Sequence, residues 1–272
     1  MPYLREPAPS YGVATWVGPG IRRIVASNPG LMTYHGTNTY LLNRPGGVVV
    51  IDPGPDDPRH VEAILMAAGG PIREILLTHT HFDHLGAAQA LKAATGAPTF
   101  GFHASADASF SPDVPLADGD YACGMVAIHT PGHASDHVCF ALPGGFLFSG
   151  DHVMSWSSSV VSPPHGDMAA YCASLRLLLA RDDAVFLPGH GPPLPQPGAY
   201  VLSLLHHRET RERAILDMLR RGPMDPPGLA EVLYAKRDIR LRPAAQRNVI
   251  AHLLKLEKEG LVAQDDEIWR AR

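Results

Sequence analysis

The segment Thr78-His-Thr-His-Phe-Asp-His84 constrains this chain more than any other feature of its sequence. It follows the apolar run Glu74-Ile-Leu-Leu77, which predicts a buried strand. The candidate metal ligands in the segment are His79, His81, Asp83 and His84. In an extended chain, side chains two residues apart point to the same face, so the first two histidines can converge on one ion. The aspartate and the third histidine follow where the chain should turn into a helix, and they can reach a second ion.

Three later segments repeat the same arrangement of a predicted strand, a turn that contains glycine, and a candidate ligand. They are Thr130-Pro-Gly-His133, Phe148-Ser-Gly-Asp151 and Leu187-Pro-Gly-His190. Ligands of open α/β sheets gather at the carboxyl ends of the strands, so these side chains are expected to meet the first four. A catalytic zinc site takes about three protein ligands and keeps one position open, and two ions need roughly twice that number. The histidine-rich set favours two Zn²⁺ ions, with Mn²⁺ or Fe²⁺ as alternatives.

Strand and helix patterns alternate through the first part of the chain and predict a layered α/β domain with mixed strands. Strands are expected near residues 48–51, 74–77, 98–101, 125–129, 137–142, 145–149 and 184–187. Helices are expected at residues 59–68, 86–95 and 168–180. The segment Gly191-Pro-Pro-Leu-Pro-Gln-Pro-Gly198 interrupts both patterns, so we place a boundary there, between domains at residues 1–196 and 197–272.

The second part of the chain is predicted to be helical. Helices at 200–220, 229–234 and 244–259, followed by a short strand at 261–263, favour a winged-helix arrangement. In the first of these helices, opposite charges at i,i+4 spacing predict ion pairs. The expected pairs are Arg208–Glu212 and Glu209–Arg213.

Charge is distributed unevenly between the two parts. The chain has a net charge of −4, made up of −7 on residues 1–199 and +3 on residues 200–272. The negative total argues against a protein built wholly around a nucleic-acid backbone. In the predicted helix 244–259, Arg247, Lys255 and Lys258 share one arc and can meet phosphates, although a solvated helix face is the commoner explanation.

At these residues the sequence resembles the metallo-β-lactamase superfamily. The resemblance lies in His79-x-His81-x-Asp83-His84 followed by His133, Asp151 and His190, and it extends over about residues 20–195. It implies an α+β fold, a four-layer αββα sandwich with a dinuclear metal site at one edge of the sheets. It further implies two sets of metal ligands bridged by Asp151, which are His79, His81 and His133 on one ion and Asp83, His84 and His190 on the other.

Segments outside the metal motifs resemble a narrower group, the β-lactamase-like protein 2 group. They are Asn28-Pro-Gly30, Gly36-Thr-Asn-Thr-Tyr40, Thr130-Pro-Gly-His-Ala-Ser-Asp-His137, Pro188-Gly-His-Gly-Pro192 and Leu253-Leu-Lys-Leu-Glu-Lys-Glu-Gly260. That resemblance implies a winged-helix-like C-terminal domain, and the animal members of the group cut single-stranded RNA. Three relatives fit less well. Flavodiiron oxidoreductases usually carry glutamate at the position of His81, glyoxalase II enzymes have a C-terminal domain with no evident counterpart here, and β-CASP nucleases need a large insertion.

The expected chemistry is metal-assisted hydrolysis. Two zinc ions about 4 Å apart can share a water and lower its pKa from ~15.7 toward ~7, which produces a bridging hydroxide. Asp151 would hold the ions, and Asp83 is placed to orient the hydroxide or handle its proton. The favoured substrate is a small ester, thioester or lactone. An endoribonuclease acting on single-stranded RNA is the alternative, and a metal-binding domain without catalysis is a second alternative that would require a missing ligand.

Several residues near the motifs are candidates for supporting or binding roles. The loop from Ser155 to Asp167 should border the metal cleft, so Trp156, His165 and Tyr171 are candidate substrate contacts. Asp52 ends a predicted strand and can orient a ligand histidine, and His137 is expected to support the site rather than bind metal.

The sequence also bears on where the protein works. Its first residues show no apolar segment behind a basic start, so we expect no signal peptide. No stretch approaches the ~20 uncharged apolar residues of a membrane span, so no membrane partner is expected. Three cysteines make no disulfide framework and fit a reducing compartment. We expect a cytoplasmic protein, and the sequence leaves its oligomeric state open.

Overall fold

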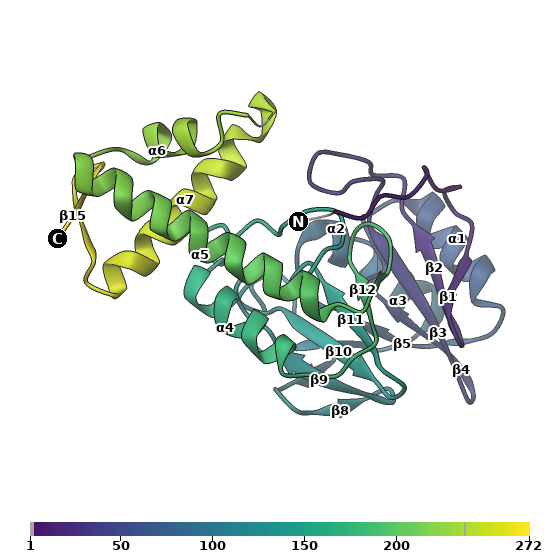
Figure 1. The fold of residues 1–272 in the computed structure, drawn as a ribbon. Helices are drawn as coiled ribbons and strands as arrows, with labels where there is room; N and C mark the ends of the chain where they lie inside the picture. Colours follow the sequence, from purple (N-terminus) through teal and green to yellow (C-terminus); the bar gives the residue numbers. More distant parts are fainter. Residues whose placement is uncertain (1–2, 237) are drawn as a thin grey trace.

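A computed structural model describes residues 3–236 and 238–272 of the chain. Two β-sheets pack face to face in the first part, and helices cover the outer face of each sheet (Figure 1). A smaller helical unit with a two-stranded sheet lies beside them. The predicted four-layer αββα sandwich with a winged-helix-like C-terminal domain is therefore confirmed.

Seven of the described strands form the first sheet in chain order. They are β1 (Thr15–Gly18), β2 (Ile21–Val25), β3 (Asn38–Arg44), β4 (Gly47–Ile51), β5 (Ile72–Leu76), β6 (Thr99–Phe102) and β7 (Val114–Leu116). From β4 to β7 the strands run parallel. Helices α1 (Pro58–Ala68) and α3 (Ala88–Thr95) cover its outer face, where Ile64 and Leu91 pack against Val50. Parallel strands covered on both faces need the near-continuous apolar runs that marked them in the sequence.

The second sheet contains the strands that carry the later ligands. In order across the sheet they are β13 (Leu194–Pro195), β12 (Val185–Pro188), β11 (Phe146–Gly150), β10 (Val138–Leu142), β9 (Met125–His129) and β8 (Tyr121–Ala122). Helices α4 (Met168–Leu179) and α5 (Gly198–Arg221) lie on its outer face. Between the sheets, side chains such as Leu76 and Phe140 form a common apolar core. This core fixes the position of one sheet relative to the other.

Helix ends coincide with residues suited to ending helices. Asp57 accepts a hydrogen bond from the Arg59 amide at the start of α1, and Asp167 accepts from Ala169 and Ala170 at the start of α4. These caps explain why the predicted bounds of both helices lie within one residue of the observed ones.

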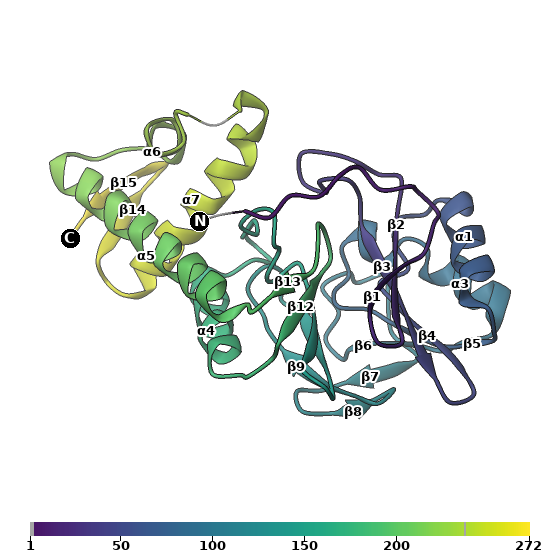
Figure 2. The same ribbon diagram turned by 45° about the vertical axis from the view of Figure 1, so that its right-hand side comes forward.

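The C-terminal unit is a winged helix. It combines the second half of α5 with α6 (Pro226–Leu233), the 3₁₀ helix η1 (Ile239–Leu241), α7 (Arg242–Lys258), β14 (Val262–Asp265) and β15 (Ile268–Ala271). Figure 2 shows the β14–β15 hairpin against α5 and α7. Its core includes Ile215, Leu229, Val249 and Trp269.

Two helices connect the two parts. The first half of α5 packs in the core under the second sheet, whereas its second half belongs to the winged-helix core. Ala251 of α7 also enters the first of these cores. The boundary near residue 197 stays a prediction, and it falls at the start of a helix that both cores share.

Some expectations were wrong or incomplete. The predicted helix at 86–95 is α3, which begins two residues later than expected, and the short helix α2 (Phe82–Leu85) that precedes it had not been expected. Neither predicted ion pair of α5 forms, since Arg208 is buried and Glu209 pairs with Arg176. Strands β1, β2, β3, β7, β8, β13 and β15 had not been expected. None of the described helices combines the length and the apolar character that crossing a membrane requires.

Candidate metal centre

The seven predicted ligands meet at one edge of the two sheets. His79 and His81 follow β5, α2 carries the next two ligands, and the other three follow β9, β11 and β12. The side chains form three overlapping groups whose ligand atoms lie within 4.8 Å of one another. These groups are His79, His81 and His133; His79, His84 and Asp151; and Asp83, His84 and His190.

Three histidines converge in the first group. The Nδ1 atom of His81 lies 2.9 Å from Nε2 of His79 and 2.9 Å from Nε2 of His133. A ring nitrogen carries either one proton or one lone pair, so His81 Nδ1 cannot satisfy both neighbours by hydrogen bonding. A cation among three nitrogen lone pairs satisfies all of them, and this donor set suits zinc.

A carboxylate lies between the two groups. Asp151 Oδ2 lies 3.4 Å from His190 Nε2 and 3.7 Å from His133 Nε2, and its Oδ1 lies 3.5 Å from His84 Nε2. Buried polar atoms without partners are rare in proteins. Among the described residues, His84 Nε2 and Asp151 Oδ1 are buried and have no hydrogen-bond partner. Divalent cations therefore fit the residues present, and Asp151 has the position of a bridging ligand.

Asp52 orients the ligand His84. Its Oδ2 lies 2.8 Å from His84 Nδ1 and accepts a hydrogen bond from Thr78 Oγ1, while its Oδ1 accepts from the Thr78 amide. The predicted contact between Asp52 and a candidate ligand histidine is present in the structure. Asp52 also has a φ of 51°, an uncommon backbone conformation for a residue other than glycine. The strained turn and the buried contacts fix the His84 ring with Nε2 directed at the site.

Other ligand rings are held in the same way, through the nitrogen that faces away from the cluster. His133 Nδ1 lies 2.7 Å from Val160 O, and His190 Nδ1 lies 3.1 Å from Gly36 O. Donation to a carbonyl leaves the lone pair on Nε2, which is the form that a metal needs. His137, expected to support the site, accepts a hydrogen bond from the Asp151 amide.

Glycine at position 189 permits the ligands to approach each other. A Cβ atom there would lie 2.4 Å from Asp151 Oδ1 and 2.6 Å from the His84 ring. The glycine-containing turns seen in the sequence thus have a steric cause at this position. A side chain before His190 would separate the ligands of the two strands.

The protonation of the site divides its histidines into two classes. Burial, together with the neighbouring histidines, lowers the pKa of His79 well below its usual value and that of His81 to about 4. Burial also disfavours the charged form of His190, but the Asp151 and Asp83 carboxylates outweigh it and raise the pKa to about 9. Two neutral histidines, His79 and His81, thus lie beside the Asp83 and Asp151 carboxylates, whose negative charge faces the space where cations would sit.

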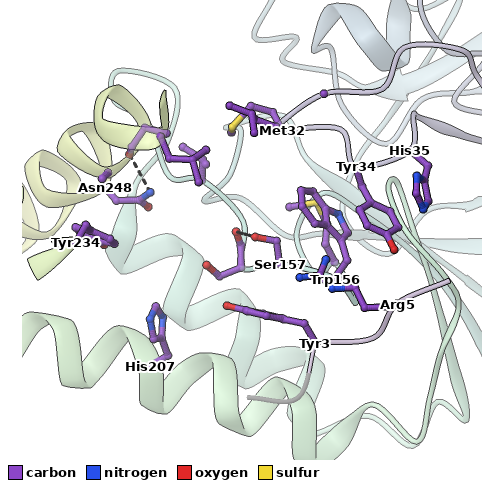
Figure 3. Close-up of a pocket in the computed structure, with 18 of the residues that line it drawn as sticks. Tyr3, Arg5, Met32, Tyr34, His35, Trp156, Ser157, His207, Tyr234 and Asn248 are labelled. Atoms are coloured by element: carbon purple, nitrogen blue, oxygen red, sulfur yellow. Dashed lines mark hydrogen bonds between the residues drawn. The ribbon is translucent and has the colours of Figure 1, made fainter. Parts of the chain in front are cut away.

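A cavity of about 430 Å³ lies at the junction of the two domains, and its lining includes Val160, whose carbonyl lies 2.7 Å from His133 Nδ1. Figure 3 shows Tyr34 and Trp156 on one side of it and Asn248 and Tyr234 on the other. Trp156, a predicted substrate contact, lines the cavity. The structure does not bring the other two candidates there. Tyr171 is fully buried and donates to His152 O, and His165 is exposed outside the described lining.

Some residues at the site were missed by the sequence reasoning. Thr37 Oγ1 donates to Asp83 Oδ2 over 3.2 Å, and Tyr34 stacks on Trp156 with 5.0 Å between ring centroids. Both lie at or beside Gly36-Thr-Asn-Thr-Tyr40, whose only signal was its resemblance to relatives. Arg208 and Asn248 were missed too, because contacts between elements far apart in sequence leave no local pattern.

Comparison with protein families accounts for this geometry. The model of the metallo-β-lactamase superfamily matches residues 32–118 and 124–190. The chain belongs to the metallo-β-lactamase superfamily. The model of the β-lactamase-associated winged helix domain matches residues 226–269. The superfamily consists generally of metal-dependent hydrolases, so the fold implies divalent metal ions at the clustered histidines and aspartates.

Individual relatives agree with this assignment. The chain is 33% identical to the "Beta-lactamase-like protein 2 homolog" of Drosophila melanogaster over 260 residues, which cover 88% of each protein. A β-lactamase domain protein from Burkholderia ambifaria has the same fold, with a TM-score of 0.83, 22% identity, and coverage of 97% of this chain and 95% of that one. A third protein, solved in a di-iron-bound form, is 31% identical, with a TM-score of 0.56, over 65% of this chain and 96% of its own.

Proposed function

We propose that this protein is a dinuclear zinc hydrolase that cleaves a small ester, thioester or lactone. The convergence of seven ligand side chains, with His84 Nε2 and Asp151 Oδ1 left without partners, supports the two-metal site. All ligands of both groups are present, which disfavours a non-catalytic metal-binding domain. When bound, two divalent ions would supply Lewis acidity that polarises the substrate oxygen and makes water acidic.

The protein's own residues would divide the remaining work. Asp151, with a side chain 9% exposed, is enclosed and suited to holding ions. Asp83, with a side chain 29% exposed, faces the open side and receives a hydrogen bond from Thr37. Burial favours the neutral form of Asp83, but His84 and His190 outweigh it and lower its pKa. Asp83 is therefore ionised at neutral pH and can orient the attacking water as a hydrogen-bond acceptor.

The adjoining cavity supports the choice of substrate. Its walls include Met32, Met154, Trp156 and Leu241. Two arginines, Arg5 and Arg208, also line it, and Arg208 is buried and donates to Ser159 O and Asn248. The catalytic part carries most of the negative charge of the chain. An apolar cavity beside such a site suits an uncharged acyl group better than a phosphate backbone.

An endoribonuclease acting on single-stranded RNA is the second candidate. Two observations favour it: the likeness to a β-lactamase-like protein 2 homologue across both domains, and the aromatic rings in the cavity, on which bases can stack. The basic face of α7 supports it less than expected. Lys255 pairs with Glu212 and Glu259, and Lys258 pairs with Asp167, so two of the three cations are already neutralised.

We propose the cytoplasm as the site of action, because the three cysteines are free and Cys139 and Cys172 are buried. The substrate partner would be a small molecule, without a membrane.

The test combines metal analysis with a substrate panel. Purified protein should carry two zinc ions per chain and hydrolyse p-nitrophenyl esters, acyl thioesters or lactones. The same preparations would be offered labelled single-stranded RNA. Full activity after metal removal would refute the mechanism. If the wild-type protein cleaves RNA but hydrolyses no ester, and Asp83→Asn loses the RNA cleavage, the second candidate is favoured.

A further inference from the structure

The cavity is lined by both domains. From the catalytic domain come Met32, Tyr34, Met154 and Trp156. The winged-helix domain supplies Tyr234, Leu241, Ala244, Ala245 and Asn248. Figure 3 shows α5, which carries His207, along a third side. The C-terminal domain thus forms one wall of the cavity.

The cavity and the metal centre are joined through the same short segments. Val160 lines the cavity while its carbonyl receives the His133 ring. His35 lines the cavity, and the carbonyl of the next residue, Gly36, receives His190. The cavity therefore lies beside the metal centre, behind the rings of His133 and His190, although none of the seven candidate ligands is among its described lining residues.

The wall formed by α7 is held in place. The Asn248 side chain is buried, and its Oδ1 accepts hydrogen bonds from the Val161 amide and from Arg208 Nη1. Its Nδ2 donates to Ala244 O, one turn earlier on the same helix. These bonds connect the cavity face of α7 to the loop that supports His133. Because these hydrogen bonds fix the position of α7, the width of the cavity depends on the size of the side chains that line it.

We propose that this cavity binds the acyl group of the substrate, and that Ala244 and Ala245 of the winged-helix domain limit its length. The proposal rests on the hydrolase function above and specifies its substrate class as esters or thioesters of medium-chain apolar acids. The volume suits a chain of about a dozen non-hydrogen atoms, taking roughly 30 Å³ for each. Alanine is the smallest side chain that lines a wall, so larger side chains at these positions would shorten the space.

The other occupant, a nucleobase, fits the lining less well. Tyr34 and Trp156 stack on each other at an interplanar angle of 23°, so their facing surfaces are already in use. Arg208 is buried over the Tyr171 ring and donates to Ser159 O and Asn248, which commits the guanidinium to protein groups. The apolar part of the remaining wall consists of Leu31, Met32, Met154, Val160, Leu241, Ala244 and Ala245, and it lies beside polar groups that include Arg5 and Asn248.

The experiment measures kcat/KM for p-nitrophenyl esters with acyl chains from two to fourteen carbons. The zinc-loaded full-length protein is compared with Ala244→Leu, Ala245→Leu and Leu241→Ala. Ala90→Leu, at an exposed helical alanine of α3, is the matched control. The leucine variants should keep activity on the two-carbon ester and lose at least roughly tenfold on the longest chain that wild type accepts. Leu241→Ala enlarges the cavity and should move the preference toward longer chains.

Two outcomes separate this inference from the proposed function. If the esters are hydrolysed and every variant has the wild-type chain-length profile, the inference is wrong while the hydrolase function stands. If no ester is hydrolysed, the hydrolase proposal fails, and calorimetry with decanoate on metal-free protein decides the inference. Binding that Ala244→Leu weakens at least tenfold, with Ala90→Leu unchanged, supports the acyl cavity. The inference is overturned if decanoate does not bind. It is also overturned if Ala244→Leu weakens the binding of adenosine monophosphate and leaves the binding of decanoate unchanged. If the leucine variants unfold, Leu241→Ala gives the decision alone.

Discussion

The metal centre and the neighbouring cavity are built in different ways. Each candidate metal ligand lies in the segment after a strand or on the short helix α2, and buried partners such as Asp52 hold the rings of the candidate ligands. The cavity combines loops, α5 and the winged-helix domain, and its walls come from residues 3 to 248. A rigid sheet edge thus provides the reaction chemistry, while elements distant in sequence provide the shape. We expect substitutions in the first region to change metal binding and those in the second to change stability or substrate choice.

The largest effect is expected from removing the carboxylate between the two metal groups. Asp151→Ala removes the oxygens that face His84, His133 and His190, so bound metal and activity should be lost together. The loss in metal affinity should exceed the roughly 100-fold upper range for supporting residues. Metal content by mass spectrometry checks this, with Asp182→Ala at an exposed position as control. Two retained ions per chain would show that Asp151 does not bridge.

A smaller effect on zinc affinity is expected from Asp52, which contacts the ring of His84 and would not bind metal itself. Asp52→Asn replaces the charge that His84 Nδ1 faces with an amide, so the ring loses part of its orientation and basicity. Zinc affinity should fall roughly 10- to 100-fold, with the fold intact. Competition with a chromophoric chelator measures the zinc affinity. The control is Asp217→Asn, at an exposed position of α5. An unchanged affinity would mean that the strand edge alone orients His84.

Zinc affinity should also depend on pH, because metals bind deprotonated ligands. With a pKa raised to about 9 by Asp151 and Asp83 against the opposing effect of burial, His190 is protonated at neutral pH in metal-free protein. Zinc has to displace this proton, so affinity should rise by at least about tenfold per pH unit between pH 6 and 8. Titrations in matched buffers test this sign. Constant affinity over the range would contradict the charge distribution described for the site.

The smallest effect on metal binding is expected at Arg208. Arg208→Met removes the donors to Ser159 O and Asn248, which connect α5, α7 and the 151–161 loop. The free energy of unfolding of metal-free protein should fall by about 2 kcal/mol, the typical value for hydrogen bonds from a charged group. Zinc affinity should change by less than about tenfold, because no ligand ring contacts Arg208. Urea unfolding and chelator competition are compared with Arg213→Met, exposed on the same helix. A larger loss of zinc affinity than in Asp52→Asn would reverse the contrast between the regions.

Much of the fold follows from local patterns. Buried parallel strands such as β4 and β5 are continuous apolar runs, and helices α1 and α4 begin at capping aspartates. Strands β1 to β3 were not predicted, although part of β3 lies in a segment that resembles relatives. Their register depends on pairing with one another and with β4, which composition does not encode locally.

The side chains of α5 show why contacts were harder to predict than elements. Spacing on the helix suggested that Arg208 pairs with Glu212, four residues later. In the structure Glu212 pairs with Lys255 of α7, and Arg208 faces the catalytic domain. Packing between domains outweighed a surface pair that contributes only about 0.2–0.5 kcal/mol.

The sequence by itself predicted the candidate ligand set, because each candidate lies in the segment after a strand or on the short helix α2, where local chain direction brings the side chains to one edge of the sheets. Through apolar periodicity it also determined the alternation of strands and helices from β4 to β12, but not the strands that complete each sheet. The tertiary structure decided which ligands group together, that Asp52 and Thr37 support them, and that Tyr171 is buried. The shape and lining of the cavity also depend on the tertiary structure, because a space between two domains exists only after both have folded and packed against each other.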